Sequence, residues 1–383
     1  MYSTKPVETL EFHHSLLVDT IRADSFLSAL LQTVKPDDVV LDIGSGTGIL
    51  ACFACQAGAR HVYAVERGPI IGLAREICAR NNLQERITFI NEWSMNTALP
   101  EPVDVLVTET MGNTGLEEGI LQWVLDAKKR FLKADARIIP RSVEMFAVPT
   151  ESAEAYEWVG RWAHSYYNLD FSPLHTLAAN NLLWMELQPE MYLSEPASML
   201  QVDLSQVNES DFSTQASFVV KRRGILHGFS GWFTAELAEG IHLSNESPSK
   251  TPSWSQTLLP LEEPLLVESG DRVELRMRTS RQGSRWQWQV SHKGPAADKP
   301  AKFLPQQSTQ AGELSTFVAT ADLQHKPVRN SSGDIDRFIL DQLNGVQTVA
   351  EIAQQTAMQF PAWFGSQEKL LERIYQLINR YAP

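Results

Sequence analysis

Short apolar runs alternate with longer helix-like segments between residues 39 and 107. The runs VVLDIG, HVYAVE, ITFIN and VDVLVTE have the length and the β-branched content of buried strands. The segments GILACFACQAG and PIIGLAREICARNN between them have the length of helices. This alternation predicts βαβ units, and therefore an α/β domain with a mostly parallel sheet. A further helix is predicted over GILQWVLDAKKRFL.

The pattern changes after the segment ARIIPRS. Polar and apolar residues alternate in VEMFAVPTES, QASFVVKRRG, LHGFSGWFTAEL, PLLVESGDRVELRMRTS and SRWQWQVSH. Alternation with period two predicts antiparallel strands that form a sheet or a β-barrel. A polar stretch rich in Gln, Pro and Lys follows from about Gly294 to Gly312, and we interpret it as a linker.

The last portion of the chain has a helical pattern. DIDRFILDQLNG ends at a glycine suited to a helix C-terminus, and Thr348 with Glu351 forms a capping-box pattern. The segment SQEKLLERIYQLINRY places four apolar residues on one stripe: Leu370, Ile374, Leu377 and Ile378. We therefore expect a small helical module at this end.

Composition narrows the class of protein. A chain of 383 residues is too long for one ordinary core, so two or three domains are expected. The net charge of −13 argues against nucleic-acid or anionic-membrane binding. No stretch has the apolar length of a signal peptide or a membrane span, so we expect a cytoplasmic protein. The three cysteines, Cys52, Cys55 and Cys78, are interpreted as packed thiols, with no metal expected.

A glycine-rich turn follows the first predicted strand. Gly44, Gly46 and Gly48 have the spacing G-x-G-x-G, whereas a dinucleotide fingerprint needs G-x-G-x-x-G. Glu66 ends the next strand, where it can accept hydrogen bonds from two ribose hydroxyls, and Asp42 suits a cationic amino-acid group better than a phosphate. Together they favour S-adenosylmethionine, a nucleoside without phosphate, over a dinucleotide or a purely structural turn.

Two carboxylates follow the strand VDVLVTE. Glu109 lies at its end and Glu118 comes nine positions later, after a glycine-containing loop. Two carboxylates brought together repel unless a cation lies between them, and a planar guanidinium fits such a pair. An equally good interpretation from spacing alone is that Glu117 and Glu118 begin a helix.

The chain resembles the protein arginine methyltransferase family, as a divergent, bacterial-type member. The resemblance is carried by VLDIGSGTGIL…AVE, TETMGNTGLEEGIL, HHSLLVDTIRADSF, RIIPRSVEMF, YNLDFSPLHTL and TPSWSQTLLPLEEPLLVESGD, over roughly residues 10 to 290. It implies a Rossmann-like class I methyltransferase domain with an N-terminal lid helix (1–140). It also implies a β-barrel substrate domain (141–312) with a dimerisation arm near 167–190, and a homodimer.

The resemblance also implies roles for individual residues. Glu109 and Glu118 would clamp the substrate guanidinium, and Asp19 would join the hydrogen-bond network around them as a third catalytic residue. The cofactor-binding residues would be His13, Arg22, Asp42, Gly44, Gly46, Gly48, Glu66, Trp93, Ser94 and Glu109. The substrate-binding residues would be Glu109, Glu118, Leu16, Ser253 and Trp254.

Several positions depart from the family pattern. Ser253 stands where a histidine is usual, and Asn113 and Glu117 replace aromatic residues. The aromatic N-terminal motif is absent, with Ser3, Thr4 and Val7 in its place. These departures make free arginine, another guanidino compound or an arginine in a dedicated peptide as good a substrate hypothesis as a general protein tail.

The C-terminal segment (313–383) resembles the small winged-helix modules of the PqqD type, which bind leader peptides. A packing or oligomerisation module is the stronger alternative. For the whole chain we expect a guanidino N-methyltransferase that uses S-adenosylmethionine. The rival hypotheses are a methyltransferase of the same fold acting on another small-molecule nitrogen or oxygen, and a catalytically silent binding protein.

Overall fold

The computed structural model describes residues 10–248, 253–295, 301–311, 328–361 and 366–381. The chain divides into two compact units, residues 1–316 and residues 317–383. Within the described residues, no helix has both the length and the apolarity needed to cross a membrane. The expected positions Ser3, Thr4 and Val7 lie outside the described residues.

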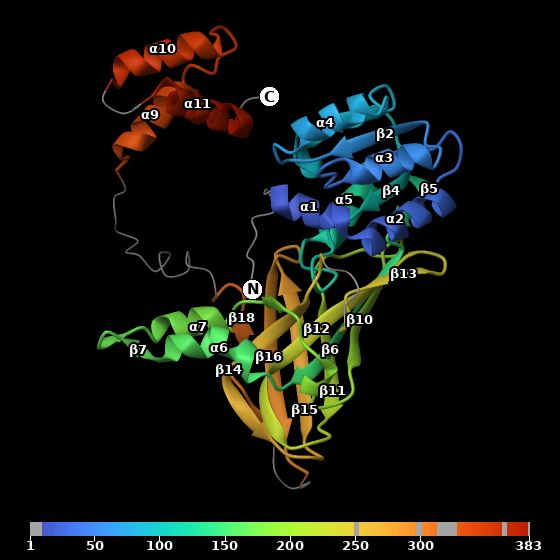
Figure 1. The fold of residues 1–383 in the computed structure, drawn as a ribbon, viewed down its shortest axis with the longest axis vertical. Coiled ribbons are helices and arrows are strands. Elements are labelled where there is room, and N and C mark those ends of the chain that lie inside the picture. The colour runs from blue at the N-terminus through green and yellow to red at the C-terminus, as the bar shows by residue number, and fades with distance from the viewer. Residues whose placement is uncertain (1–9, 249–252, 296–300, 312–327, 362–365, 382–383) are drawn as a thin grey trace. The chain divides into compact units, whose positions relative to one another are not determined.

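The first unit begins with helices α1 (Leu10–Val18) and α2 (Thr20–Thr33), followed by the predicted parallel sheet (Figure 1). The sheet has five strands in the order β3-β2-β1-β4-β5, and every neighbouring pair is parallel. The strands are β1 (Val39–Ile43), β2 (His61–Val65), β3 (Ile87–Ile90), β4 (Val103–Thr108) and β5 (Leu132–Ile139). The connecting helices are α3 (Ile49–Gln56), α4 (Ile71–Arg80) and α5 (Ile120–Arg130). The expected α/β domain is therefore confirmed.

The second half of this unit consists of antiparallel sheets that begin after a cis Ile139–Pro140 peptide bond. One sheet has the order β10-β6-β12-β14-β9, with β13 paired to β12. Its strands are β6 (Ser142–Thr150), β9 (Leu183–Met185), β10 (Ala197–Asp203), β12 (Gly224–Ala238), β13 (Ile241–Ser244) and β14 (Gln256–Val267). The other sheet has the order β11-β15-β16-β17, with β18 paired to β16. Its strands are β11 (Ser213–Val219), β15 (Arg272–Ser280), β16 (Arg285–Lys293), β17 (Lys302–Phe303) and β18 (Gln307–Ser308).

The expected β-barrel is not confirmed, because the described strands are hydrogen-bonded in these two sheets and no closed sheet is seen among them. The interpretation of Gly294 to Gly312 as a linker was wrong in part. Strands β17 and β18 both pair with β16, and the Gln307 side chain donates to the carbonyl oxygen of Ala179. Strands β17 and β18 therefore belong to the sheet region. The Gln307 side chain is buried, whereas Lys302 and Phe303 are exposed.

Around the segment expected to hold a dimerisation arm (167–190), two helices and a small hairpin extend from the sheets, and the first helix precedes that segment (Figure 1). The helices are α6 (Ala153–Gly160) and α7 (Pro173–Ala179), with a 3-10 turn (Arg161–Ala163) after α6. Between them, strands β7 (Ser165–Tyr166) and β8 (Leu169–Asp170) pair as an antiparallel hairpin. The hairpin turn exposes Tyr167 to 95%.

The second unit is helical, as predicted. It contains α9 (Ser331–Leu340), α10 (Val349–Gln359) and α11 (Gln367–Tyr381), and the capping box of Thr348 and Glu351 is formed. The predicted stripe on α11 is buried in a separate core with Ile335, Ile339, Ile352 and Ala353. This small unit therefore has its own hydrophobic core.

Candidate functional site

The glycine loop (residues 44–48) turns sharply between β1 and α3. Gly44, Gly46 and Gly48 all have positive φ, at 77°, 53° and 80°. Only glycine adopts this backbone region at little cost, which explains the three glycines. A side chain at Gly46 would lie 3.6 Å from the His13 ring, so the lid helix α1 lies directly against the loop.

Glu66 follows β2 and faces the same loop. Its carboxylate accepts hydrogen bonds from the backbone N–H of Gly46 at 3.1 Å and of Gly68 at 2.6 Å. Each carboxylate oxygen can accept more than one hydrogen bond, so Glu66 keeps acceptor capacity for a ligand. The structure thus places Glu66 at the carboxyl end of the sheet, where open α/β sheets bind ligands.

Several buried polar atoms around the glycine loop have no hydrogen-bond partner among the described residues. They are both carboxylate oxygens of Asp42, the Ser45 hydroxyl, Nε2 of His13 and Nε of Arg22. Burial and the neighbouring Glu66 raise the pKa of Asp42 to about 8. Buried polar atoms normally have partners, so this cluster is the donor and acceptor set expected for a polar ligand.

Asp19 and Arg22 connect the N-terminal helices to the site. The buried Asp19 carboxylate caps α2 by accepting from the Arg22 N–H at 3.0 Å. The Arg22 side chain donates to the Leu16 carbonyl oxygen at 3.3 Å and forms an ion pair with Glu109 at 2.5 Å. The side chains of Arg22 and Glu109 are only 5% and 10% exposed. Leu16 therefore contributes its backbone oxygen here.

The clamp loop (residues 109–118) follows β4. Glu118 has an exposed side chain. Nevertheless, the surrounding protein and the charges of Glu109 and Glu117 raise its pKa above the ordinary value. Glu109 has Arg22 as a cationic partner, whereas no ion pair to Glu118 is formed within the described residues. The loop thus holds two interacting carboxylates, Glu109 and Glu118. Of these, only Glu109 has an ion-pair partner among the described residues, which is Arg22.

Glu117 has a role that the sequence did not suggest. Its carboxylate turns back into the clamp loop and accepts from the backbone N–H of Asn113 at 2.7 Å and of Thr114 at 3.1 Å. Gly112, which has a φ of 66°, lies against this side chain. Glu117 therefore braces the loop, and the alternative that Glu117 and Glu118 begin a helix is wrong, because α5 starts at Ile120.

The return loop (residues 253–255) brings the antiparallel region to the clamp loop. The Ser253 N–H and hydroxyl both donate to Asp19, at 3.2 and 2.5 Å. Trp254 is buried, and the centre of its ring lies 5.7 Å from the Arg22 guanidinium carbon. Ser253 and Trp254 thus join Asp19, Arg22 and Glu109 in one cluster.

Trp93 and Ser94 are placed differently from each other. Trp93 is 43% exposed, and its ring has the Arg67 guanidinium 4.3 Å above it and Trp123 5.9 Å away. Ser94 is buried and begins a 3-10 turn (Ser94–Asn96) whose first carbonyl oxygen accepts from Arg130. These contacts do not connect either residue to the glycine loop, so their cofactor roles stay predictions.

The cysteines are packed thiols at the sheet. Cys52 Sγ and Cys78 Sγ are 3.4 Å apart, and Cys55 is buried. Burial raises the pKa of Cys55 to about 11. No group of three or more His, Cys, Asp or Glu residues is arranged to hold a metal ion in the described parts of the chain.

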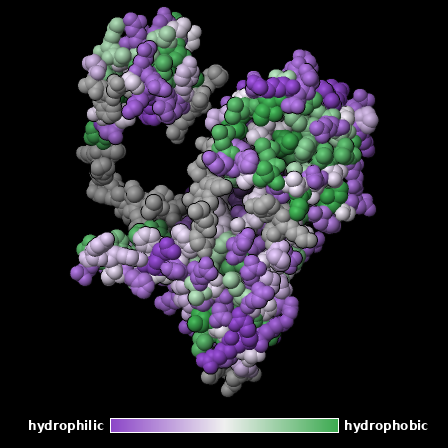
Figure 2. Space-filling view, in the orientation of Figure 1, coloured by the Kyte–Doolittle hydropathy of each residue, from purple (hydrophilic) through white to green (hydrophobic). Residues whose placement is uncertain are grey.

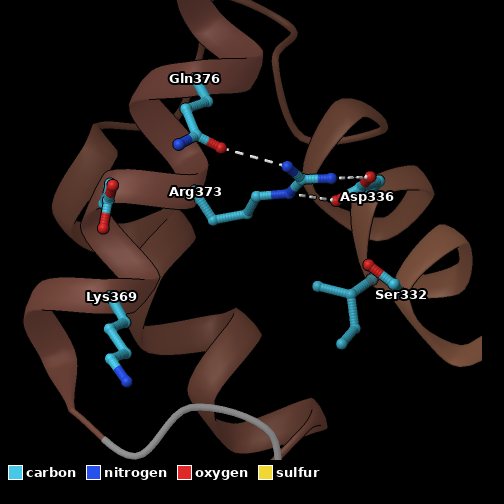
Figure 3. Close-up of a pocket in the computed structure, with 7 residues that line it drawn as sticks. Ser332, Asp336, Lys369, Arg373 and Gln376 are labelled. Atoms are coloured by element: carbon cyan, nitrogen blue, oxygen red, sulfur yellow. Dashed lines mark hydrogen bonds and ion pairs between the residues drawn. The ribbon is translucent and has the colours of Figure 1, made fainter. Parts of the chain in front are cut away.

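The second unit has a hollow of about 380 Å³ between α9 and α11 (Figure 3). Arg373 crosses it, donating to Asp336 at 2.8 Å and to the Gln376 side-chain oxygen at 3.1 Å. Lys369 and Glu372 also line it, so both signs of charge are present. This mixed, solvent-open lining lacks the converging buried polar atoms found around the glycine loop.

Comparisons with known proteins agree with this geometry. Residues 141–290 match the model of the arginine methyltransferase oligomerization subdomain, and residues 24–140 match that of ribosomal protein L11 methyltransferase. Protein arginine N-methyltransferase 1 of Schizosaccharomyces pombe is 32% identical over 270 residues, which cover 68% of this chain and 79% of that protein. The chain belongs to the protein arginine N-methyltransferase family. Family membership matches the resemblance seen in the sequence.

Other members of the protein arginine N-methyltransferase family are similar over the same region. Human protein arginine N-methyltransferase 2 is 33% identical over 282 residues, which cover 69% of this chain. The chain spans about 65% of the length of that relative. The solved enzyme–prozyme heterotetramer of Trypanosoma brucei PRMT1 with AdoHcy has a TM-score of 0.68 at 26% identity, covering 78% of this chain and 98% of that one.

Proposed function

We propose that this protein is an S-adenosylmethionine-dependent N-methyltransferase that acts on a guanidino nitrogen, as in an arginine of a peptide or protein. The observation that carries the proposal is the clamp loop. Glu109 already holds one guanidinium, that of Arg22, whereas Glu118 has no ion-pair partner within the described residues; the surrounding protein, and then the charges of Glu109 and Glu117, raise the pKa of Glu118. A substrate guanidinium would supply that cation and fit the planar geometry of two carboxylates.

The residues around the glycine loop fit the proposed cofactor. Asp42 and the buried, unpartnered atoms of His13 and Ser45 would face its amino-acid portion, and Glu66 would accept from its ribose hydroxyls. When bound, S-adenosylmethionine would supply a methyl group on a sulfonium and leave as S-adenosylhomocysteine. The glycine loop has Ile49 where a dinucleotide fingerprint has its third glycine, which disfavours a dinucleotide.

The chain's own residues would prepare the guanidinium for attack. Ionised Glu109 and Glu118 would concentrate positive charge on the nitrogens they contact and leave the remaining nitrogen more nucleophilic. Fixing the substrate in one orientation would add to the rate, since positioning removes much of the entropic barrier. Ser253 cannot take up the released proton at neutral pH, so the proton would pass to a clamp carboxylate or to water.

A turnover panel tests this proposal. The full-length protein would be incubated with S-adenosylmethionine and, separately, with arginine, agmatine and arginine-containing peptides, and methylated products would be identified by mass. Methyl transfer to a guanidino nitrogen is the expected result. Methylation of an amine or hydroxyl compound instead would favour the rival small-molecule enzyme. Binding of S-adenosylhomocysteine with no turnover on any substrate would favour a silent homologue.

We infer that the protein also forms a homodimer through its arm. The hairpin of β7 and β8 exposes Tyr166, Tyr167 and Leu169. Apolar residues also gather over the helices of the parallel-sheet region (Figure 2), where Leu73 and Ile77 on α4 are 50% and 40% exposed. An exposed apolar arm and an exposed apolar helix face on one chain suit a closed, two-fold association.

The oligomeric state is measured by light scattering. The wild-type chain should have twice the mass of a monomer, and the double variant Tyr167→Ser/Leu169→Ser should shift toward a monomer. A matched control is Val328→Ser, which removes a 90% exposed apolar side chain in the second unit. A monomeric wild type at micromolar concentration would contradict the dimer.

A further inference from the structure

A buried asparagine links the clamp loop to the antiparallel sheets. Asn245 follows β13 and is fully buried. Its side-chain N–H₂ donates to the carbonyl oxygens of Asn113 at 2.8 Å and of Ser255 at 2.7 Å. Its side-chain oxygen accepts from the Phe233 N–H at 2.8 Å. One side chain thus holds the clamp loop, the return loop and strand β12 together.

Asn113 completes this link from the clamp loop. Its side-chain oxygen accepts from the Ser255 N–H at 2.9 Å, while its own N–H donates to Glu117. Because Asn113 and Ser255 are 142 positions apart, the two loops gain a direct connection that no local structure provides. The buried Asn245 side chain makes three of the four hydrogen bonds that an amide can make, and the partly buried Asn113 side chain makes two.

The return loop is therefore fixed on both sides of Trp254. Ser253 is bonded to Asp19 on one side, and Ser255 is bonded to Asn113 and Asn245 on the other. Trp254 between them packs edge-on against Phe233 at 5.2 Å and lies over Arg22. The indole thus has a fixed place beside the Arg22–Glu109 ion pair.

We propose that Asn113 and Asn245 are positioning residues that hold Trp254 as a rigid wall of the guanidinium site. This inference rests on the proposed function, since it names what orients the substrate between Glu109 and Glu118. Neither asparagine touches the reacting atoms. Both act through the return loop, so their loss changes the alignment of the substrate and not its charge partners.

The main test variant is Asn113→Ala, because Asn113 is only partly buried and the variant removes one acceptor. Turnover per folded site is expected to fall between about 10- and 100-fold, as for small misplacements of reacting groups. The number of folded sites is counted by calorimetry with S-adenosylhomocysteine. A variant that is merely unstable would lose binding sites and keep its kcat per site, which would overturn the proposal.

A double-mutant cycle tests whether Asn113 acts through Trp254. If it does, Asn113→Ala should cost little further kcat/KM in a Trp254→Ala background, because the wall is already gone. Full additivity of the two losses would overturn the proposed route. Asn81→Ala is the matched control, since that exposed side-chain amide donates to the Ile77 carbonyl oxygen of its own helix, and the variant should keep wild-type turnover.

Hydrogen exchange gives a readout that does not depend on turnover. In Asn113→Ala, the amide of Ser255 loses its acceptor, so peptides covering residues 253–256 should exchange about three- to tenfold faster. Peptides covering β1 and α3 should be unchanged. Unchanged exchange at Ser255 would overturn the proposal that Asn113 holds the return loop, even if the protein methylates arginine. If residues 253–256 exchange faster in Asn113→Ala but the wild-type protein has no methyltransferase activity, the link between Asn113 and the return loop is supported and only the proposed function is refuted.

Discussion

The Ser253 hydroxyl donates a hydrogen bond of 2.5 Å to the Asp19 carboxylate, across 234 positions of the chain. This contact joins the N-cap of α2 to the return loop, and the same carboxylate also bonds the Arg22 N–H. The residue that the family resemblance places at position 253 is a histidine, so a group that cannot titrate near neutral pH stands at this position. The contact therefore holds the loop but cannot relay a proton as an imidazole would.

Ser253→Ala tests this contact. It removes the hydroxyl bond and keeps the backbone N–H bond to Asp19. We expect kcat/KM to fall by about tenfold, since hydrogen bonds to charged groups contribute about 1.5–3 kcal/mol and half of the contact survives. Ser253→Thr keeps the hydroxyl and is the control that should recover activity. Equal activity in the Ala and Thr variants would show that the hydroxyl has no part in the site.

Glu118→Gln tests the clamp. The amide keeps the size of the side chain but removes the negative charge that would hold positive charge on the substrate. Turnover should fall at least about 100-fold, as for loss of a preorganised electrostatic group. The affinity for S-adenosylhomocysteine should stay within about threefold. Glu76→Gln, in an exposed pair with Arg80 on α4, is the matched control. Near-wild-type turnover of Glu118→Gln would refute the guanidinium clamp.

Glu118 also predicts how stability depends on pH. Its pKa in the folded protein is raised above the ordinary 4.5, first because the surrounding protein removes water from the carboxyl group and then because of the charges of Glu109 and Glu117. The folded state thus binds this proton more tightly than the unfolded state, so the free energy of unfolding falls as pH rises above about 4.5. Asp42, raised from 3.8 to about 8, acts in the same direction.

The measurement compares ligand-free wild type and Glu118→Gln by urea unfolding at several pH values between 5 and 8. The Gln variant has no proton to lose, so its stability relative to wild type should increase as pH rises. A difference that stays constant over this range would mean that the pKa of Glu118 is not raised. With substrate present, kcat/KM of the wild type should fall as pH is lowered through the raised pKa.

Glu66→Ala tests the cofactor site. Glu66 now bonds the N–H groups of Gly46 and Gly68, so its loss removes both a ligand acceptor and a brace of the glycine loop. S-adenosylhomocysteine affinity, measured by calorimetry, should fall at least about tenfold. Glu85→Ala, an exposed acid of the same domain, should bind as wild type does. Binding of a nicotinamide dinucleotide by the wild type would contradict the assignment.

Patterns of neighbouring residues predicted the parts of the fold that depend on apolar periodicity and on backbone conformation within one segment. Strands β1 to β4 and helices α3 to α5 follow from apolar periodicity, and the positive φ angles of the glycine loop explain why Gly44, Gly46 and Gly48 stand there. Asp42 and Glu66 could be placed at the site because the carboxyl ends of parallel strands share one edge.

Contacts between distant segments could not be predicted in the same way. Asn113, Glu117 and Asn245 are ordinary polar residues in the sequence, and their roles depend on loops that only the folded chain brings together. The sequence around the short strand β18 was interpreted as a linker, because two residues are too few to show a periodic pattern. The strand forms by pairing with Gln287 and Trp288 of β16. Whether the antiparallel strands close into a barrel also depends on such pairings.

The second unit should fold independently of the first. Helices α9, α10 and α11 share a core of their own, which includes Ile335, Ile339 and Ile374, and Thr348 caps α10 with its side chain. A chain ending at Gly312 keeps strands β17 and β18 and removes this core as a whole. We therefore expect the shortened protein to be soluble, with S-adenosylhomocysteine affinity unchanged.

The kinetics of that shortened protein then identify what the second unit does. If the unit holds a peptide substrate, its removal should raise KM for that peptide and leave kcat unchanged, which is the sign of lost uniform binding. If it serves packing or oligomerisation, KM should stay constant while the mass in solution or the thermal midpoint changes. Ile374→Asp in the full chain disrupts only the small core and should reproduce the effect of truncation. An insoluble truncated protein would refute the independent unit, since the first unit would then need these helices to complete its own core.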